Sequence, residues 1–305
     1  RLRLRRRRDG ELLEFIAVRD PTVRVLKLLR GEVDMLQNDI PPELVTMLRQ
    51  REDIQVSTAP GSNFAYLGFN MEDPATGRLA VRRAVALAID RGAIIRYVLG
   101  GAARPAIGLL PSDHWSSDPS LQPIPYDPAA ARRLLQQAGY GEGRPLRLVY
   151  KTSSDPFRLR LATIIQQQLA QVGIEVELRS YDWGTFYGDI KAGRFQMYSL
   201  MWVGIKMPDI YRYVFHSSAL PPAGANRGRF VSPVADHLIE AAEAAPTMAA
   251  QAPYYRQLQA YLLEMMPYAP LWYEDHVFAA RPDIREYRIA RDGNYDGLVE
   301  VERMP

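Results

Sequence analysis

The segment 146–209 alternates between two hydrophobic periods, which predict the order strand, helix, strand, helix, strand. It opens with a short apolar run, and the next residues repeat apolar positions every three or four residues, as an amphipathic helix does. Ile174, Val176 and Leu178 then alternate with polar residues, which is typical of a half-buried strand. A second helix leads to another apolar strand over residues 196–203.

Two consecutive strand–helix–strand units predict a parallel sheet with right-handed crossovers. In such sheets, ligands bind beyond the carboxyl ends of the strands. The third predicted strand runs into the loop 201–209. We therefore expect an α/β fold in which this loop belongs to the ligand-facing edge of the sheet.

The remaining chain gives shorter signals of the same kind. One long apolar face predicts a helix over residues 79–95. Two strands are expected at 54–57 and 65–70, joined by a turn at Pro60-Gly61. A further strand is expected near 270–279, followed by turns and short strands to the end of the chain.

The composition is that of a folded globular protein with a mild positive charge. The chain has 305 residues, of which 47% are hydrophobic and 24% charged, and its net charge is +3. Its length favours one large or two smaller domains. Six of the first eight residues are arginine. A basic arm for nucleic acid or lipid is one interpretation, but the alternation with leucine before Asp9-Gly10 favours an edge hairpin. Because no aromatic residue interleaves with these arginines, we expect no nucleic-acid partner.

The sequence lacks the residues and motifs that several classes of enzyme and metal site require. There is no cysteine, which excludes disulfides and thiolate catalysis. The four histidines show no metal-ligand spacing, and the motifs GxSxG, GxGxxG and the P-loop are absent. We expect no enzymatic activity, no metal and no cofactor. No apolar stretch reaches the roughly 18–20 residues that span a bilayer. The chain starts at Arg1 without an initiator methionine, so we expect a processed or truncated product.

Short motifs spread along nearly the whole chain carry a resemblance to a known family. The most specific motif is the helix segment Val81–Arg91, and the others stand in the family's order: Asp20-Pro21-Thr22, Leu29–Asp34, Leu67–Asn70, Tyr126–Pro128, Ala138–Tyr140, Trp202 with Pro208-Asp209, Asn226-Arg227 and Met266–Trp272. By these motifs the chain resembles family 5 of the bacterial extracellular solute-binding proteins, the binding components of peptide- and nickel-type ABC importers.

The resemblance implies a type II periplasmic-binding-protein-like α/β fold, with two lobes that close about a hinge. It places residues 1–78 and 271–305 in lobe I and residues 79–270 in lobe II, with hinge crossings near 70–78 and 271–273. Members of the family have a substantial portion before the Asp20-Pro21 segment. The chain therefore resembles only the C-terminal part of the family, and we expect lobe I to be incomplete.

The resemblance also implies a function in transport. The protein would bind a peptide or peptide-like solute in the cleft between the lobes and deliver it to the permease subunits of an ABC transporter. We expect a monomer in the periplasm, or a lipid-anchored extracellular protein in a bacterium with one membrane. The alternatives are a non-peptide solute, such as a nickel complex or a sugar, and a sensory or accessory binding role outside transport.

Four candidate ligand-binding residues come from the central loop and the loop after it. Trp202 is expected to offer a stacking wall, although a core position at a strand end is the competing interpretation. Asp209 either pairs with a cationic group or caps the next helix. Asn226 and Arg227 lie on a loop that the family places near the cleft. There Arg227 could form a bidentate pair with a carboxylate, with a surface role as the alternative.

Tyr66, near the predicted hinge, and Tyr211, which also suits a core position, complete the candidate set.

One departure from the family concerns specificity. Dipeptide-binding members carry an acidic residue shortly after the tryptophan-glycine of the central loop, and it pairs with the peptide's α-amine. This chain has Ile205-Lys206 there. We therefore expect no ordinary dipeptide held through that carboxylate; Lys206 either favours an anion or is a solvated lysine.

Overall fold

The structure is a computed structural model, and it describes residues 1–304. Within that range the chain forms two compact units, each assembled from separate stretches of sequence. The first unit comprises residues 1–62, 95–104 and 274 onward, and the second comprises residues 63–94 and 105–273. Four elements contribute residues to both units: β4 (Gln55–Phe69), α4 (Arg91–Tyr97), β5 (Ala103–Pro105) and β9 (Tyr268–Ala280).

The first unit combines short strands with two helices over a small apolar core. Asp20 begins the first helix by accepting a hydrogen bond from the backbone N of Val23 at 2.9 Å, with Pro21 at the first helical position. The elements of this unit are β1 (Leu2–Arg5), β2 (Leu12–Phe15), α1 (Pro21–Leu29), β3 (Met35–Gln37), α2 (Pro42–Arg49), β10 (Ile284–Arg285), the 3₁₀ helix η1 (Asp296–Val299) and β11 (Glu302–Arg303).

The arginine-rich start of the chain forms the predicted hairpin. Strands β1 and β2 pair antiparallel, with Leu2 opposite Phe15. Arg6 turns inward and forms ion pairs with Asp9 at 2.6 Å and Glu11 at 2.5 Å. The arginine-rich start thus forms a two-stranded hairpin, in which the side chains on both faces of β1 are exposed.

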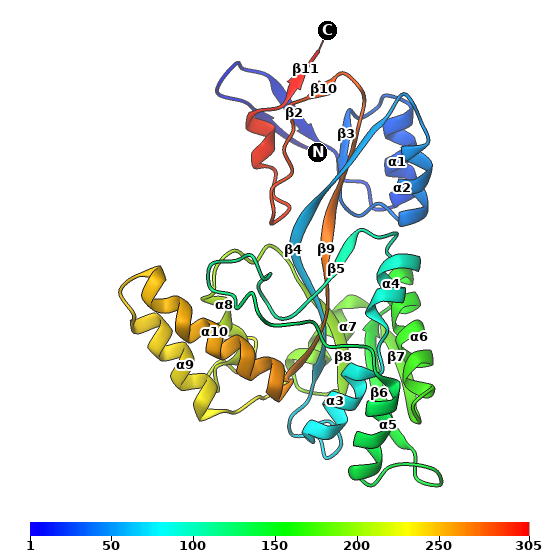
Figure 1. The fold of residues 1–305 in the computed structure, drawn as a ribbon. Coiled ribbons are helices and arrows are strands. Elements are labelled where there is room, and N and C mark those ends of the chain that lie inside the picture. Colours follow the sequence, from blue (N-terminus) through cyan, green and yellow to red (C-terminus); the bar gives the residue numbers. More distant parts are fainter. Residues whose placement is uncertain (305) are drawn as a thin grey trace. The chain divides into compact units, whose positions relative to one another are not determined.

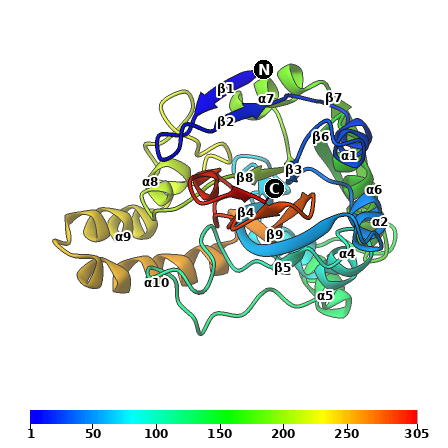
Figure 2. The same ribbon diagram turned by 90° about the horizontal axis from the view of Figure 1, so that it is seen from above.

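The second unit is a mixed α/β layer built on the segment that the sequence analysis singled out (Figure 1). Helices α9 and α10 lie side by side in both views (Figure 1; Figure 2). The elements of this unit are α3 (Leu79–Leu87), α5 (Pro128–Gln137), β6 (Leu146–Ser153), α6 (Pro156–Ala170), β7 (Ile174–Tyr181), α7 (Trp183–Lys191), β8 (Met197–Trp202), α8 (Ile210–Phe215), α9 (Pro233–Ala244) and α10 (Met248–Met265).

The sheet of the second unit confirms the predicted parallel pairing. Strand β6 pairs parallel with β7 on one side and with β8 on the other, with α6 and α7 as the crossovers. On its other edge, β8 pairs antiparallel with the second half of β4, so that Tyr66 lies opposite Leu200. The sheet is therefore mixed, and the carboxyl ends of β6 and β8 lie next to each other.

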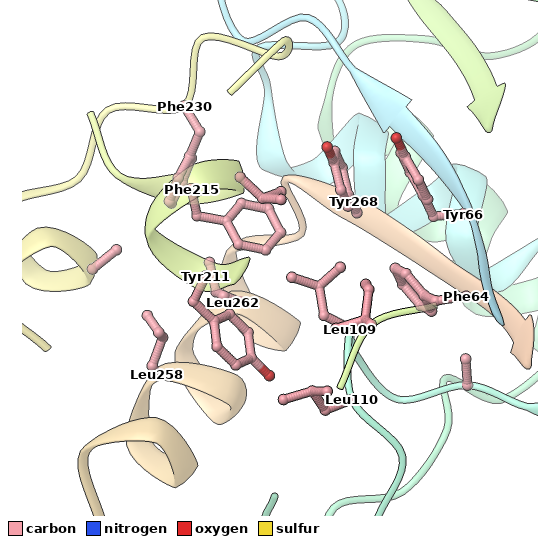
Figure 3. Close-up of a cluster of buried hydrophobic side chains, with 14 of the residues drawn as sticks. Phe64, Tyr66, Leu109, Leu110, Tyr211, Phe215, Phe230, Leu258, Leu262 and Tyr268 are labelled. Atoms are coloured by element: carbon pink, nitrogen blue, oxygen red, sulfur yellow. The ribbon is translucent and has the colours of Figure 1, made fainter. Parts of the chain in front are cut away.

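An aromatic core covers one face of the β4–β8 pair. Tyr66 and Tyr268 stack with ring centroids 3.9 Å apart, and their side chains run parallel in Figure 3. Tyr211, from α8, stacks on Tyr255 at 5.8 Å and lies with Leu258 and Leu262 in the same cluster (Figure 3). Burial of this many large side chains is the main stabilising contribution in the second unit.

Two predicted elements differ from the structure. The two strands expected around Pro60-Gly61 are one continuous strand, β4. A Cβ atom on Gly61 would lie 2.2 Å from the carbonyl oxygen of Glu274. The glycine therefore marks a close approach of two backbones and not a turn.

The helix expected over residues 79–95 is split into α3 and α4. Asp90 starts α4 by accepting from the backbone N of Ala93 at 2.8 Å. The buried guanidinium of Arg91 donates to the carbonyl oxygens of Ala86 at 2.9 Å and Ile89 at 3.1 Å. These bonds satisfy carbonyl groups at the end of α3, which an unbroken helix would have satisfied internally.

The residue ranges predicted for the lobes and hinge can be compared with those of the two units. The predicted hinge segment 70–78 lies wholly within the second unit, and the segment 271–273 ends where β9 passes from the second unit to the first. The division into lobes at residues 78 and 270 stays a prediction. Over the described range, none of the helices combines the length and apolarity that a membrane span requires.

Candidate functional site

A cavity of about 230 Å³ lies in the second unit, at the carboxyl ends of β6 and β8. This is the edge at which parallel sheets of this kind bind ligands. Strands β4 and β9 supply the remaining wall, through Ala65, Leu271 and Trp272. The cavity therefore draws on residues from one end of the sequence of this unit to the other.

Alternate side chains of β8 and β6 line the cavity, together with Leu200 and Ser153. Ser199, Met201 and Val203 alternate along β8 and the residue after it, and all three line the cavity. Tyr150 and Thr152 do the same at the end of β6. The intervening Trp202 belongs to the opposite face, where it contacts the aromatic core.

Two capped helices complete the wall. Asp155 accepts from the backbone N of Arg158 at 2.9 Å and begins α6, which places Arg158 and Leu161 at the cavity. Asp182 accepts from the backbone N of Thr185 at 3.1 Å and begins α7, which places Trp183 there. The hydrogen bonds from Thr185 hold the pKa of Asp182 below its usual value, so this cap is ionised at neutral pH.

Two polar atoms of the lining residues make no regular hydrogen bond in the described part of the chain, although the Ser199 side chain lies beside one of them. They are the hydroxyl of Tyr150 and the Nε1 of Trp272, and both side chains are buried. Burial raises the pKa of Tyr150, so its hydroxyl keeps its proton. An unsatisfied buried polar group costs about 1–3 kcal/mol. Such groups are uncommon in folded proteins.

The charges around the cavity are unbalanced. Among the described residues that line it, Arg158 alone carries a formal charge. The nearby acid on α7, Asp189, forms ion pairs with Lys151 at 2.6 Å and Arg194 at 2.7 Å. These hydrogen bonds lower the pKa of Asp189. The described lining of the cavity thus contains one basic side chain and no acidic side chain.

A second cluster lies on the other face of the β4–β8 pair, around the buried Arg227. Its guanidinium donates to the hydroxyls of Tyr66 and Tyr187, each at 3.1 Å. It also lies over two rings, 4.8 Å from the centroid of Trp202 and 5.3 Å from that of Tyr187. Burial raises the pKa of Tyr66 well above its usual value, so its hydroxyl is neutral and accepts from the arginine.

The cavity and this cluster share a boundary at α7. Trp183 lines the cavity and stacks on Tyr187 at 5.3 Å with an interplanar angle of 7°. Trp183 is 59% exposed, although it is one of the largest apolar side chains of the unit. A continuous aromatic surface therefore runs from the cavity to Arg227.

Comparison with known proteins decides the family. The family model described as bacterial extracellular solute-binding proteins, family 5 Middle, matches residues 11–220. The chain belongs to this family. The resemblance inferred from short motifs is thereby confirmed.

The curated relatives of this family-5 chain are longer than the chain itself. It is 31% identical to a di/tripeptide-binding protein of Pseudomonas aeruginosa, over 89% of this chain and 51% of the relative. It is 28% identical to a dipeptide-binding protein of Escherichia coli, over 84% of this chain and 49% of the relative. The chain thus spans about half the length of the curated relatives that it matches.

Solved structures confirm the predicted fold class, a type II periplasmic-binding-protein-like fold. NikA from Brucella suis, in complex with Fe(III)-EDTA, superposes with a TM-score of 0.85 at 23% identity, covering 97% of this chain and 62% of that one. A dipeptide-binding protein from a Pseudoalteromonas species, in complex with Met-Leu, gives a TM-score of 0.79 at 26% identity, covering 93% and 56%.

The structure brings three of the six predicted site residues of this family-5 chain together. Tyr66, Trp202 and Arg227 form the cluster described above. Asn226 is adjacent in sequence, but its amide is fully engaged: Nδ2 donates to the carbonyl oxygens of His216 and Phe230, and Oδ1 accepts from the backbone N of Phe230. Asn226 therefore shapes the loop that presents Arg227.

The other two predicted residues make no hydrogen bond or cation–π contact with Arg227 in the described range. Asp209 is exposed at the N-cap position of α8, where its side chain makes no capping hydrogen bond. Tyr211 is 2% exposed in the aromatic core, in agreement with the competing core interpretation. Ligand contact by any of the six residues stays a prediction. Over residues 1–304, no group of three or more His, Asp or Glu side chains could hold a metal ion.

Sequence reasoning missed Tyr150, Trp272 and Tyr187. Tyr150 and Trp272 occupy apolar strands, where an aromatic residue is normally a core residue. A signal was available for Tyr187, because it follows Trp183 by four residues and two aromatic residues at that spacing share a helix face.

Proposed function

We propose that this protein is the solute-binding component of an ABC importer and that the cavity in its second unit binds a peptide or peptide-like solute. The observation that carries the proposal is the cavity at the carboxyl ends of β6 and β8, with the buried polar groups of Tyr150 and Trp272 in its wall. Membership of family 5 supports the same function. Delivery of the solute to permease subunits, a location in the periplasm and a monomeric state belong to this proposal, with a lipid-anchored extracellular form as the alternative location.

The chemistry of the cavity favours a peptide over a bare metal ion. The relatives' names include di/tripeptide-binding proteins, and one solved relative holds Met-Leu. Met201, Leu161 and Leu271 give the cavity apolar walls for a side chain, and the tyrosine, tryptophan and serine groups offer hydrogen bonds. Histidine, aspartate and glutamate are missing from the described lining, so the cavity lacks the usual ligands of a transition metal. The proposal includes no catalytic step.

Isothermal titration calorimetry tests the proposal. The titrants are peptides of two to five residues, a monosaccharide and the nickel–histidine complex. We expect saturable binding of peptides and none of the sugar. Ser199→Trp fills the cavity and should abolish binding, whereas the control Ser180→Trp places the same ring at an exposed position of β7 and should not. Binding of the nickel complex or the sugar in place of peptides would contradict the proposal.

A further inference from the structure

We propose that a cavity between β2 and β3 in the first unit accepts one extended polypeptide segment, which pairs with both strands. The segment is supplied by the part of a family-length protein that lies outside this chain's match with its relatives. All lining residues of this cavity belong to the first unit, so the inference goes beyond the solute cavity of the second unit and stands independently of it.

The cavity has a volume of about 430 Å³ and is lined by two strands that do not pair with each other. Every residue of β2 and of β3 contributes to its wall. Strand β2 pairs with β1 in the hairpin, and β3 pairs with β9 at the end of the large sheet. Since one water needs roughly 10–15 Å³ of such space, this volume exceeds that of a hydration site.

The second unit contains the same order of elements with a strand in the corresponding position. There β7, α7 and β8 follow one another in the chain, and both strands pair parallel with β6, which lies between them. Strand β8 also pairs antiparallel with β4. In the first unit, β2, α1 and β3 repeat this order, and β3 pairs antiparallel with β9. The cavity lies where the equivalent of β6 is expected.

The backbone of β3 has an edge that β9 does not use. Asn38 donates its backbone N–H to the carbonyl oxygen of Val277 in β9 at 2.8 Å. Because alternate residues of an antiparallel ladder bond to the partner strand, Leu36 also bonds to β9. Met35 and Gln37 then direct their backbone N–H and C=O groups away from β9, as the residues of an edge strand do.

The same reasoning applies to β2. The backbone N of Arg6 donates to the carbonyl oxygen of Glu11 at 2.8 Å, next to the hairpin turn. The alternation of the ladder makes Leu13 bond to β1, whereas Leu12 and Glu14 direct their backbone groups away from it. Both strands that line the cavity therefore have one edge available for a further strand.

Arg24 on α1 joins the ends of these two strands. Its Nη1 donates to the carbonyl oxygen of Val18, after β2, at 3.1 Å, and its Nη2 donates to that of Asp39, after β3. The carboxyl ends of β2 and β3 thus lie at the same edge, as in a parallel sheet. Arg24 lines the cavity, and its Nε is buried without a hydrogen-bond partner in the described range. A carbonyl group at the end of a strand between β2 and β3 would give this donor its acceptor.

The length of the relatives supports the assigned source of the segment. About half of each curated relative lies outside its match with this chain. A typical strand needs only about 5–6 residues of that part. A parallel strand covered on both faces is a nearly continuous apolar run, so we expect a segment rich in valine, isoleucine and leucine.

Peptides test the inference. Fluorescent peptides of about 15 residues, long enough to contain a typical strand, are blocked at both ends. Together they cover the unmatched part of the di/tripeptide-binding protein of Pseudomonas aeruginosa. Fluorescence anisotropy with the full chain should show saturable binding of one apolar peptide or of two that overlap. This binding should persist in Ser199→Trp and in excess Met-Leu, which address the solute cavity of the second unit.

Three outcomes of the anisotropy measurement would overturn the inference. They are binding of none of the peptides, displacement of the bound peptide by Met-Leu, and self-association of the chain that blocks the peptide. The last would assign the cavity to a second copy of the chain. None of the three would contradict the proposed solute-binding function.

Amide exchange at residue resolution tests the predicted pairing. With the peptide bound, the backbone N–H groups of Met35 and Gln37 should exchange about tenfold more slowly, because each gains a hydrogen bond. The N–H of Leu36 already bonds to β9 and should change little. Equal protection of all three residues, or protection of Leu36 alone, would contradict strand pairing.

Two variants at one position separate the backbone from the side chain. Met35→Pro removes the N–H that points away from β9 and keeps the bonds of Leu36 and Asn38 to β9, whereas the control Met35→Ala keeps all of these N–H groups. We expect Met35→Pro to weaken peptide binding about tenfold more than Met35→Ala does. Circular dichroism checks that both variants fold. A peptide that binds the two variants equally well would refute the pairing with β3.

Discussion

Removing the hydroxyl group from either of two buried tyrosines in the second unit should change the free energy of unfolding, but in opposite directions. Tyr150 and Tyr66 are both 0% exposed. The hydroxyl of Tyr150 lies beside Ser199 but makes no regular hydrogen bond among the described residues, whereas that of Tyr66 accepts from Arg227 at 3.1 Å. We expect Tyr150→Phe to stabilise the ligand-free protein and Tyr66→Phe to destabilise it.

The size of each change in the free energy of unfolding depends on which polar groups remain without a partner once the hydroxyl is removed. Removing an unsatisfied buried hydroxyl removes its desolvation cost, and we expect the free energy of unfolding to rise by about 1 kcal/mol, the lower end of that cost. Removing the Tyr66 hydroxyl strands a buried guanidinium donor, so a loss of about 2 kcal/mol is expected. Both rings stay in place, so neither change creates a large cavity.

Urea unfolding of ligand-stripped protein, followed by circular dichroism and by tryptophan fluorescence, measures both changes. Shifts in the midpoint at constant slope report stability. The two probes must agree, because a chain with two compact units can unfold in more than one step. If Tyr150→Phe were as destabilising as Tyr66→Phe, the Tyr150 hydroxyl would have a partner and the reasoning about the cavity wall would be wrong. With peptide bound, the gain from Tyr150→Phe should shrink or reverse, because the ligand then uses the hydroxyl.

Three further predictions concern the scaffold. Asn226→Ala should lower the free energy of unfolding by about 2 kcal/mol, since its loop loses three buried hydrogen bonds, and urea unfolding measures this. Arg91→Met should cost at least about 2 kcal/mol in the same assay, because it removes three buried hydrogen bonds to carbonyl oxygens. Lys151 lowers the pKa of Asp189 below the ordinary value of 3.8, so the pair stabilises the fold above that pH and the stability is lost as the pH falls through the lowered pKa. Asp189→Asn should therefore flatten the stability decline below about pH 4; an unchanged pH profile would exclude the pair as its cause.

The α/β core could be predicted because its signals are local. Helical and strand periods alternate cleanly over residues 146–203, and caps such as Asp155 and Asp182 mark where helices begin. Predictions failed where a distant contact overrides a local signal. In the sequence, Gly61 indicates a turn. In the structure, it allows the backbone at Glu274 to approach closely.

The candidate site was predictable only in part, for the same reason. Trp202 and Arg227 stand in short motifs on which the resemblance to the family was based. Their meeting with Tyr66 depends on the antiparallel pairing of β4 with β8, which joins residues more than a hundred positions apart. That the Tyr150 hydroxyl makes no regular hydrogen bond likewise depends on how the cavity wall packs. In the sequence, Tyr150 is an ordinary strand tyrosine.

Native mass spectrometry of the purified protein tests the central claim most directly, followed by denaturing release of whatever it carries. The same measurement is made on Ser199→Trp, after its fold has been checked by circular dichroism. We predict released masses in the peptide range from the parent protein and their loss from the variant, because the new ring occupies the cavity at the ends of β6 and β8. Peptides retained by the variant, or a single non-peptide solute released from the parent, would contradict the account.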